Sequence, residues 1–434
     1  MKRINVGLLG LGTVGSGVYK LLTRRRRDLR RLVDADLIIK RIAIKDLREL
    51  KTRPLVRVDK SIVTENARAI INDPEIDIIV EVIGGIEPAK SFILEAINNG
   101  KQVVTANKEL LAKFGKDIME ASDEKGVDVY FEASVGGGIP IIRALKESLA
   151  GNKISMVMGI VNGTTNFILT KMSEEMWPFR RALEDAQRRG YAERNPRQDI
   201  EGDDAQSKIA ILASIAFNAR VTADQVFKEG ISAITPQDIV YAHEMGYTIK
   251  LIALAKEDKD GLDVRVHPTM ISKNHPLASV RDVYNAIFIE GDAVGEVMLF
   301  GQGAGSLPAA SAVVGDIIEV ARNLQYGRSG KVGCTCFETK RVKPIDEIVT
   351  SYYLLMGAVD KPGVLAKVAR VFGDSHVSLA SVIQKRTRGN LAELVFVTHM
   401  VQEKNLKQAL RKIAKLDVVD RVYNVIRVEG GPGA

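Results

Sequence analysis

The sequence predicts an α/β protein with a doubly wound domain, a second domain with an open mixed sheet, and a small C-terminal domain. Short apolar runs alternate with amphipathic stretches from residue 4 to residue 132, which is typical of a doubly wound parallel sheet. The spacing of strands and helices then becomes irregular. The last part of the chain has the order β-α-β-β-α-β, which is the ferredoxin-like arrangement.

Composition places the chain among globular proteins. Its 434 residues include 62 Lys and Arg against 54 Asp and Glu, so the net charge is +8. Hydrophobic residues make up 46% and charged residues 27%, which excludes disordered and collagen-like chains. The only cysteines are Cys334 and Cys336, too few for a four-ligand zinc site or a disulfide framework. We expect two reduced thiols in a cytoplasmic protein.

Three segments are compared with nucleic-acid or membrane elements. Six of the eight residues from Arg24 to Arg31 are Arg, but the stretch has a helical pattern without interleaved aromatics, which favours a solvated helix end over a nucleic-acid patch. The apolar N-terminal run carries nucleotide-type glycines and lacks a clear signal cleavage site. Val297 to Gly315 is uncharged but contains glycines and Pro308, so we expect no membrane span.

Five apolar runs are the expected strands of the doubly wound domain, which we place at residues 1–133. Those strands are Ile4–Leu9, Asp36–Ile44, Asp77–Val82, Gln102–Thr105 and Asp128–Glu132. A helix is expected from about Gly15 to Leu32. Another is expected over Glu87–Asn98, because Pro88 suits its first turn and Gly100 follows its end.

The remaining elements are expected in two groups. The second domain, at residues 134–305, has strand candidates at Lys153–Val161, Leu251–Lys256, Asp263–Ile271, Val283–Glu290 and Val294–Phe300. Its helix candidates are Asn166–Ser173, Phe179–Arg189, Asp203–Phe217 and Pro236–Met245. Helix Pro308–Leu324 and a linker at residues 326–349 follow. The C-terminal domain, at residues 350–428, has strands Ser351–Val359, Val377–Gln384, Leu391–His399 and Val418–Val428, with helices Gly363–Phe372 and Asn405–Ile413.

A glycine pattern at the end of the first strand indicates dinucleotide binding. Gly10, Gly12 and Gly15 form G-x-G-x-x-G directly after a predicted strand and at the start of a helix, which is the context that this pattern requires. The glycines permit a tight turn, and backbone N–H groups at the helix start then approach a pyrophosphate. The alternative is a turn needed for packing alone. We predict a Rossmann-type domain that binds NADP or NAD.

The ends of two further strands offer cofactor contacts. Lys45 at the end of the second strand suits the 2′-phosphate of NADP, whereas the neighbouring Asp46 suits the ribose hydroxyls of NAD; we favour NADP. An ordinary surface charge pair remains the alternative. Thr105 to Lys108 lies where a strand ends and a helix begins, so Lys108 either touches a ligand or is a surface lysine.

The segment from Gly190 to Lys208 is the densest candidate site. Glu193 and Asp199 lie in a loop, and Asp204 and Lys208 lie one turn apart on one face of the following helix. Such a pair is usually a surface ion pair. Because this helix continues as an apolar run, the pair also suits a buried lysine that donates a proton.

Two other segments carry weaker signals. Glu132 to Pro140 is a glycine-rich bend after a strand; its carbonyls would face substrate or a cation, or the bend serves packing only. Val161 to Asn166 is a polar turn whose amides and hydroxyls bind a ligand or cap a helix.

Taken together, these motifs resemble homoserine dehydrogenase in its long form, which has a C-terminal ACT domain. The resemblance extends from Ile4 to about Val428 and rests on several long motifs in the right order. They are Gly10–Gly15, Glu81–Gly85, Val103–Lys108, Phe131–Ile141, Gly159–Met172, Gly190–Lys208 and Gly301–Asp316. Two positions depart from the family pattern: Asn195 replaces an Asp, and Asp203 replaces an apolar residue.

The resemblance implies the interconversion of L-aspartate 4-semialdehyde and L-homoserine with NAD(P), on the route to threonine, methionine and isoleucine. It implies that Lys208 is the general acid, that Asp204 orients substrate and lysine, and that Glu193 and Asp199 hold the substrate ammonium. Cofactor contacts are implied at Thr13, Val14, Lys108 and Gly305. A sodium ion is implied at Glu132, Val135, Gly137 and Ile139, held mainly by backbone oxygens.

The resemblance also implies regulation and assembly. The turn Asp360-Lys361-Pro362-Gly363 is similar to the ACT pattern, which implies an amino-acid effector, threonine as the leading candidate, and a homodimer or homotetramer. Residues 306–325 would return to complete the nucleotide-binding domain. Two rival functions are another ACT-bearing Rossmann dehydrogenase and a non-catalytic amino-acid sensor on the same scaffold. No nucleic-acid or membrane partner is expected.

Overall fold

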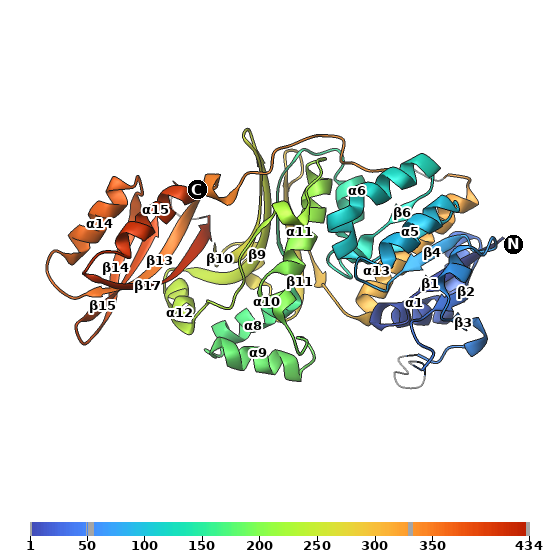
Figure 1. The fold of residues 1–434 in the computed structure, drawn as a ribbon, viewed down its shortest axis with the longest axis horizontal. Helices are drawn as coiled ribbons and strands as arrows, with labels where there is room; N and C mark the ends of the chain where they lie inside the picture. Colours follow the sequence, from blue (N-terminus) through green and yellow to red (C-terminus); the bar gives the residue numbers. More distant parts are fainter. Residues whose placement is uncertain (1, 49, 51–55, 329–332, 431–434) are drawn as a thin grey trace. The chain divides into compact units, whose positions relative to one another are not determined.

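The computed structural model describes residues 2–48, 50, 56–328 and 333–430. The chain divides into two compact units (Figure 1). Unit 1 comprises Met1–Val157, Ser207–Ala223 and Asn285–Lys340, and unit 2 comprises Met158–Gln206, Asp224–Tyr284 and Arg341–Ala434. Part of the expected linker, residues 329–332, lies outside the described residues.

Unit 1 is built on a six-stranded sheet in the order β3-β2-β1-β4-β5-β6, and every pairing in it is parallel. The strands are β1 (Arg3–Leu9), β2 (Asp36–Ala43), β3 (Val63–Thr64), β4 (Ile78–Glu81), β5 (Gln102–Thr105) and β6 (Val129–Tyr130). This order confirms the predicted doubly wound sheet. It places the start of the chain at the centre of the sheet, where the strand order reverses and ligands bind.

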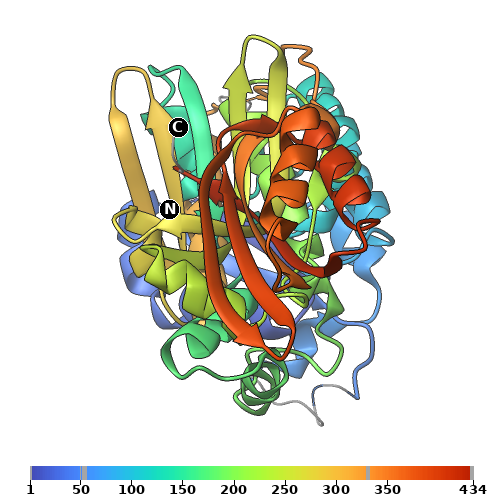
Figure 2. The ribbon, with the colours of Figure 1, turned by 90° about the vertical axis from the view of Figure 1, so that its left-hand side faces the viewer.

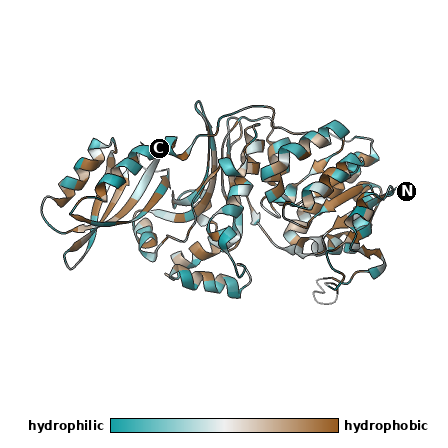
Figure 3. Cartoon of the chain, in the orientation of Figure 1, coloured by the Kyte–Doolittle hydropathy of each residue, from teal (hydrophilic) through white to brown (hydrophobic). Residues whose placement is uncertain are grey.

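Helices cover this sheet and close its core. They are α1 (Thr13–Arg24), α2 (Arg26–Val33), α4 (Ala67–Ile71), α5 (Ala89–Asn98), α6 (Lys108–Lys125), α7 (Ile141–Arg143) and α13 (Ser306–Gln325). The residues of β4, and those of β1 from Val6 to Leu9, are buried, because parallel strands are covered on both faces; Figure 3 shows these strands as hydrophobic. Helix α13 contributes Val313 and Ile317 to the same core and packs along α1, where an added Cβ at Gly17 would lie 2.4 Å from the Ser306 carbonyl oxygen.

The helical stretch expected from about Gly15 to Leu32 is confirmed, and it is divided into two helices. Arg25 leaves helical geometry at φ −102° and ψ 15°, between α1 and α2. The break lets Arg26 form an ion pair with Asp36 at 2.5 Å. The other arginines of the stretch have exposed side chains, as expected for a solvated helix surface.

Unit 2 begins with helices and continues as a mixed sheet. Its helices before the C-terminal part are α8 (Gly163–Glu174), α9 (Phe179–Arg188), α10 (Arg197–Ile200) and α12 (Pro236–Glu244). Helix α11 (Asp203–Ala216) starts in unit 2 and ends in unit 1, and β7 (Ile154–Ile160) also contains the division. Strands β9 (Tyr247–Asp258) and β10 (Gly261–Ser272) form a long antiparallel hairpin, and the short β8 (Phe227–Lys228) pairs with β10 in parallel. Strands β11 (Tyr284–Gly291) and β12 (Gly295–Gln302) are neighbours and, apart from Tyr284, belong to unit 1.

The C-terminal part of unit 2 has the predicted ferredoxin-like order. It runs β13 (Val349–Val359), α14 (Val364–Asp374), β14 (Leu379–Arg388), β15 (Leu391–Thr398), α15 (Glu403–Ile413) and β17 (Val419–Glu429), with a short β16 (Val401–Gln402). Helices α14 and α15 lie on one face of these strands (Figure 2) and share a core that includes Phe372 and Phe396. Strand β17 pairs with β13 on one side and with β10 on the other, so this sheet continues that of unit 2.

Several boundaries differ from the sequence-based expectation. Strand β9 begins at Tyr247 because its first residues, including the polar Lys250, pair with the end of β10. Strand β6 stops at Tyr130, and Glu132 lies in a 3-10 turn whose backbone N–H donates to Asp316. The short elements β3, α4, α10, β8 and β16 carry too little periodicity to be expected. Within the described parts of the chain, no helix is both long and apolar enough to cross a membrane.

Candidate active site

The loop between β1 and α1 in unit 1 has the geometry of a dinucleotide cradle. Gly10 has φ +103°, and an added Cβ at Gly15 would lie 2.1 Å from the Gly10 carbonyl oxygen. At Gly12, which caps α1, an added Cβ would meet nothing within 4 Å. The backbone is therefore tightly packed behind the loop and open in front of it, as pyrophosphate binding at a helix N-terminus requires.

The N-terminus of α13 lies beside this loop. Gly305, with φ +122°, caps α13, and the Ser306 hydroxyl donates to the Thr13 carbonyl oxygen at 2.6 Å. The structure thus brings the expected cofactor residues Thr13, Val14 and Gly305 together, although Gly305 is 290 residues further along the chain than Gly15.

A buried hydrogen-bond network shapes the carboxyl ends of β4 and β5. The Thr105 hydroxyl donates to Glu81 at 2.6 Å, and Glu81 also accepts from the N–H groups of Ile83 and Gly84. Asn107 caps α6 through the Leu110 N–H and donates to the Gly85 carbonyl oxygen. Lys108 is the first residue of α6, half-buried at this edge of the sheet. Thr105 therefore positions the loop through its side chain.

At the end of β2, the two candidates for ribose recognition differ. The Asp46 carboxylate accepts hydrogen bonds from the Arg48 side chain and backbone, and these bonds lower the pKa of Asp46. Lys45 has an exposed side chain. A positive side chain is thus presented to solvent, while the acid already has a cationic neighbour.

In unit 2, one amide holds two of the predicted carboxylates together. The Asn162 side-chain amide donates to Asp199 at 2.7 Å and to Asp204 at 2.9 Å. The amide oxygen of Asn162 accepts from the Thr165 N–H and so caps α8. Asn162 and Asp204 are buried, and Asp199 is half-buried. Two carboxylates fixed side by side suit a ligand ammonium.

Helix α11 places Asp204 in its first turn and Lys208 one turn later. Both side chains are buried, and the apolar residues that follow pack the helix on its other faces. The surface-pair alternative for Asp204 and Lys208 is therefore wrong. Glu193 lies on the loop after α9, with an exposed side chain.

The glycine-rich bend after β6 begins at Glu132, a buried acid whose backbone N–H donates to a second buried acid, Asp316. Both Glu132 carboxylate oxygens accept N–H groups, from Ile142 at 2.8 Å and Arg143 at 2.9 Å, and burial raises the pKa of Glu132. Gly136 and Gly137 have positive φ, while Val135 and Ile139 are buried. Among the described residues, no group of three His, Cys, Asp or Glu side chains could hold a metal, so a sodium ion here would depend on backbone oxygens.

The sequence gives no role to Glu81 and Asp316 and only part of the role of Asn162, although all three residues shape the site. Glu81 ends an apolar strand, and a lone acid in that position is the signal that would have identified it. The turn holding Asn162 was interpreted as a cap or a ligand contact; the structure shows the cap, and also the bridge between two acids. Asp316, in the middle of α13, is buried beside Glu132 and Arg143, and only the fold brings these residues together.

The fold and the site define an NAD(P)-dependent oxidoreductase of the doubly wound α/β class with an appended ferredoxin-like domain. Family models match three consecutive parts of the chain: the homoserine dehydrogenase NAD-binding domain at residues 10–132, homoserine dehydrogenase at 140–318, and the ACT domain at 352–418. The chain belongs to the homoserine dehydrogenase family.

Relatives with this name are similar over the whole chain. The homoserine dehydrogenase of Bacillus subtilis is 42% identical over 432 residues, which cover 99% of both chains. That of Synechocystis sp. is 43% identical over 436 residues, covering 98% of this chain and 99% of the relative. The crystal structure of a homoserine dehydrogenase from Thiobacillus denitrificans has a TM-score of 0.93 at 42% identity and covers 99% of both chains.

Replacing Asp316 by Asn should change how stability depends on pH. Burial raises the pKa of Asp316 to about 8 from an ordinary 3.8, so the folded state binds more protons than the unfolded state between these values. The free energy of unfolding of the wild type therefore falls as pH rises through this window. We expect the unfolding temperature of Asp316→Asn, measured by calorimetry, to rise relative to that of the wild type as pH increases from 5 to 8.

Asp117→Asn is the matched control. The Lys90 side chain lowers the pKa of the partly exposed Asp117, so stability from Asp117 is lost only when pH falls below its ordinary pKa. Its difference from the wild type should stay constant from pH 5 to pH 8. A constant difference for Asp316→Asn as well would contradict the account of the buried acid.

Proposed function

We propose that this chain reduces L-aspartate 4-semialdehyde to L-homoserine, and catalyses the reverse reaction, with NADP as the preferred cofactor. The observation that carries the proposal is the bridge from Asn162 to Asp199 and Asp204, with Lys208 one turn further along α11. In a member of this family, that arrangement supplies charged partners for the substrate and a buried proton donor.

The cofactor would be held by the loop Gly10–Gly15 with Thr13 and Val14, by Gly305 beside it, and by Thr105 and Lys108 at the end of β5. When bound, the reduced nicotinamide supplies a hydride to the aldehyde carbon. The open face at Gly12 and the helix N-termini of α1 and α13 fit the negative pyrophosphate. Lys45, exposed beside an Asp46 already bonded to Arg48, supports recognition of a 2′-phosphate.

The substrate ammonium would bind Asp199 and Asp204, with Glu193 as a third carboxylate. An ammonium that loses its water needs such partners, because an unpaired buried charge is costly. Asn162 fixes the two acids relative to each other by donating its amide hydrogens to both of them.

Lys208 would donate a proton to the aldehyde oxygen as the carbonyl is reduced. Negative charge develops on that oxygen, so an ammonium donor stabilises the transition state more than the ground state. Asp204 would orient both the lysine and the substrate. A sodium ion at the bend Glu132–Ile139, bound by backbone oxygens of Val135, Gly137 and Ile139, would stabilise the bend beside the cofactor loop.

The ACT domain would bind an amino-acid effector, and threonine is the candidate. The turn Asp360–Gly363 supports this role: Gly363 has φ +86° at the start of α14, and the Asp360 carboxylate accepts from Gln384 and Thr387 on β14. Feedback by a product of threonine, methionine and isoleucine synthesis follows from this proposal. The cytoplasmic location and the homodimer or homotetramer stay predictions.

Lys208→Ala should abolish most turnover. General acid catalysis by a positioned side chain contributes about 10²–10⁴-fold, so we expect kcat to fall by about that factor with L-aspartate 4-semialdehyde. The measurement is the loss of NADPH absorbance, and separately of NADH absorbance; the wild type should show the higher kcat/KM with NADPH.

Lys116→Ala, an exposed lysine on α6, is the control and should behave as the wild type. Turnover that survives in Lys208→Ala would remove this lysine as the proton donor. Absence of turnover in folded wild-type protein with either cofactor would contradict the enzymatic proposal and favour the sensor alternative.

L-Threonine should inhibit the wild type, and Gly363→Val should weaken that inhibition. A β-branched residue is strained at a positive φ, so the turn that would face the effector must change. We expect the threonine concentration for half inhibition to rise by about tenfold or more, measured from initial rates with L-valine as the control amino acid. A wild-type rate that does not depend on threonine would overturn the regulatory role.

A further inference from the structure

A short segment of unit 2, Val226–Ile231, lies against the residues that lead into α11. The Gln206 side chain, in the first turns of α11, donates to the Val226 carbonyl oxygen at 2.8 Å. Lys228 forms an ion pair with Asp203, the first residue of α11. The Ile231 N–H donates to the Ile200 carbonyl oxygen at 2.9 Å. This segment therefore determines where α11 begins.

The contact leaves little room for adjustment. An added Cβ at Gly230 would lie 2.3 Å from the Ile200 carbonyl oxygen and 2.7 Å from Glu201 Cα. The segment is also anchored to β10, through the pairing of β8 and through the Glu229 N–H, which donates to Val266 at 2.8 Å. A shift of the segment must therefore be accompanied by a shift of the residues before α11.

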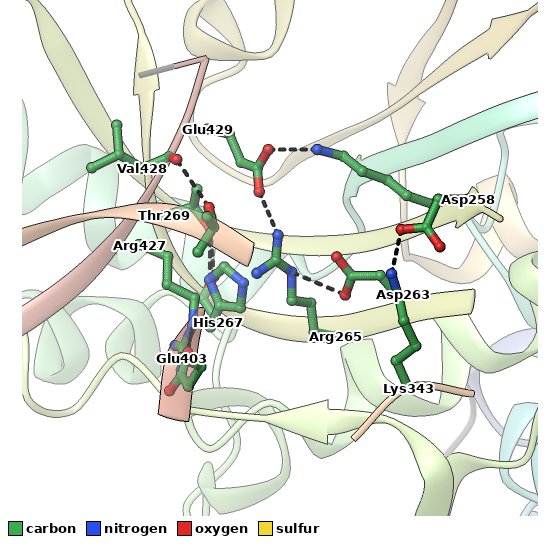
Figure 4. A network of polar contacts seen from close by, with 12 residues as sticks. Asp258, Asp263, Arg265, His267, Thr269, Lys343, Glu403, Arg427, Val428 and Glu429 are labelled. Carbon is green, nitrogen blue, oxygen red and sulfur yellow. Dashed lines mark hydrogen bonds and ion pairs between the residues drawn. The ribbon is translucent and has the colours of Figure 1, made fainter. Parts of the chain in front are cut away.

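The same segment is held from its other side by the ACT domain. Arg427 on β17 donates to the Glu229 carboxylate at 2.8 Å, and its guanidinium lies 4.9 Å from the centre of the Phe227 ring. Arg427 is itself fixed by Glu403 at the start of α15 through two hydrogen bonds. Figure 4 shows Arg427 and Glu403 beside His267 and Arg265 at the junction of β10 and β17.

The junction of β10 and β17 is built so that a displacement of β17 or α15 is passed on to the segment Val226–Ile231. Arg427 and Glu403 are each 6% exposed in their side chains; burial alone would lower the pKa of Arg427, but the Glu403 carboxylate raises it. Arg265 on β10 also bonds Glu429 on β17, at 2.6 Å. Buried hydrogen-bonded groups hold one another in place, so movement of β17 or α15 reaches Glu229.

We propose that Asp203, Lys228 and Glu229 are positioning residues that connect the ACT domain to the first turn of α11. The chain of contacts runs from Glu403 to Arg427, Glu229, Lys228 and Asp203, and the next residue is Asp204. The relevance of this connection to catalysis rests on the role proposed above for Asp204 and Lys208. The physical connection itself does not depend on that role.

Asp203 is the distinctive member of this connection. It stands where the family pattern has an apolar residue, and it adds a charge that Lys228 pairs. Asp203 also lies in the first turn of α11, where a carboxylate interacts favourably with the helix dipole. This chain thus ties the start of α11 to β8 by charge.

The test uses variants that keep the fold. The Lys228 and Asp203 side chains are 31% and 41% exposed, and Glu229→Ala leaves Arg427 paired with Glu403, so neither Asp203→Asn nor Glu229→Ala strands a buried charge. Asp374→Asn is the matched control, because Asp374 pairs with Arg370 on α14 at 65% and 84% exposure and neither residue belongs to the connection. Unfolding midpoints of all variants should stay near that of the wild type.

Kinetics test the connection through the coupling of Glu229, which lies in the segment, with Asp203, which contacts the segment through Lys228. We expect Asp203→Asn and Glu229→Ala each to lower kcat/KM about three- to tenfold by displacing α11. The double variant should lose no more than the worse single variant, because both changes break one connection. Lys228→Met should act like Asp203→Asn, and Lys228→Arg should restore most of the rate. Unchanged rates, or losses that multiply in the double variant, would overturn the proposal.

Amide hydrogen exchange gives a readout that needs no turnover. A peptide covering residues 197–210 should exchange faster in Lys228→Met and in Glu229→Ala than in the wild type and in Asp374→Asn. Equal exchange in all four proteins would overturn the connection. If the wild type does not reduce L-aspartate 4-semialdehyde, the proposed function is contradicted. Faster exchange in Lys228→Met and Glu229→Ala than in the wild type would still support the connection.

Discussion

The structure around the proposed substrate site depends on the Asn162 amide, which keeps two carboxylates within hydrogen-bond reach of one group. Asp199 and Asp204 come from separate elements, the short α10 and the first turn of α11, and their charges repel. Two donated hydrogens offset that repulsion without neutralising either acid. Because Asn162 also caps α8, the position of the acids is coupled to the main chain of a buried helix.

Helix α11 holds Asp204 and Lys208 one turn apart. Its first turn carries an acid bonded to Asn162, its second turn carries Lys208, and its later residues are apolar and buried. One rigid element thereby relates the group that would bind the substrate ammonium to the group that would protonate the aldehyde oxygen. The cofactor loop of unit 1 follows the same logic, since the N-termini of α1 and α13 are fixed side by side by Ser306 and Gly17.

The sequence predicts those parts of the arrangement that depend on local patterns of residues. The glycine pattern at Gly10–Gly15, the parallel strands and the ferredoxin-like order all follow from periodicity and turn residues. The break at Arg25 did not, because it depends on Asp36 in the next strand. The same holds for Asn162, Asp316 and the contacts of Arg427, whose partners lie far away in the sequence. Asp203 was visible only as an unusual residue, and its pairing with Lys228 required the fold.

The most direct test of the account compares two aldehydes, L-aspartate 4-semialdehyde and succinic semialdehyde, which lacks the amino group. Asn162→Ser keeps a cap for α8 but loses the two-armed donor. The account predicts that the preference of the wild type for the amino-bearing aldehyde, measured as the ratio of kcat/KM values, falls about tenfold or more in this variant. Equal losses with both aldehydes would contradict the central role of the bridged carboxylates.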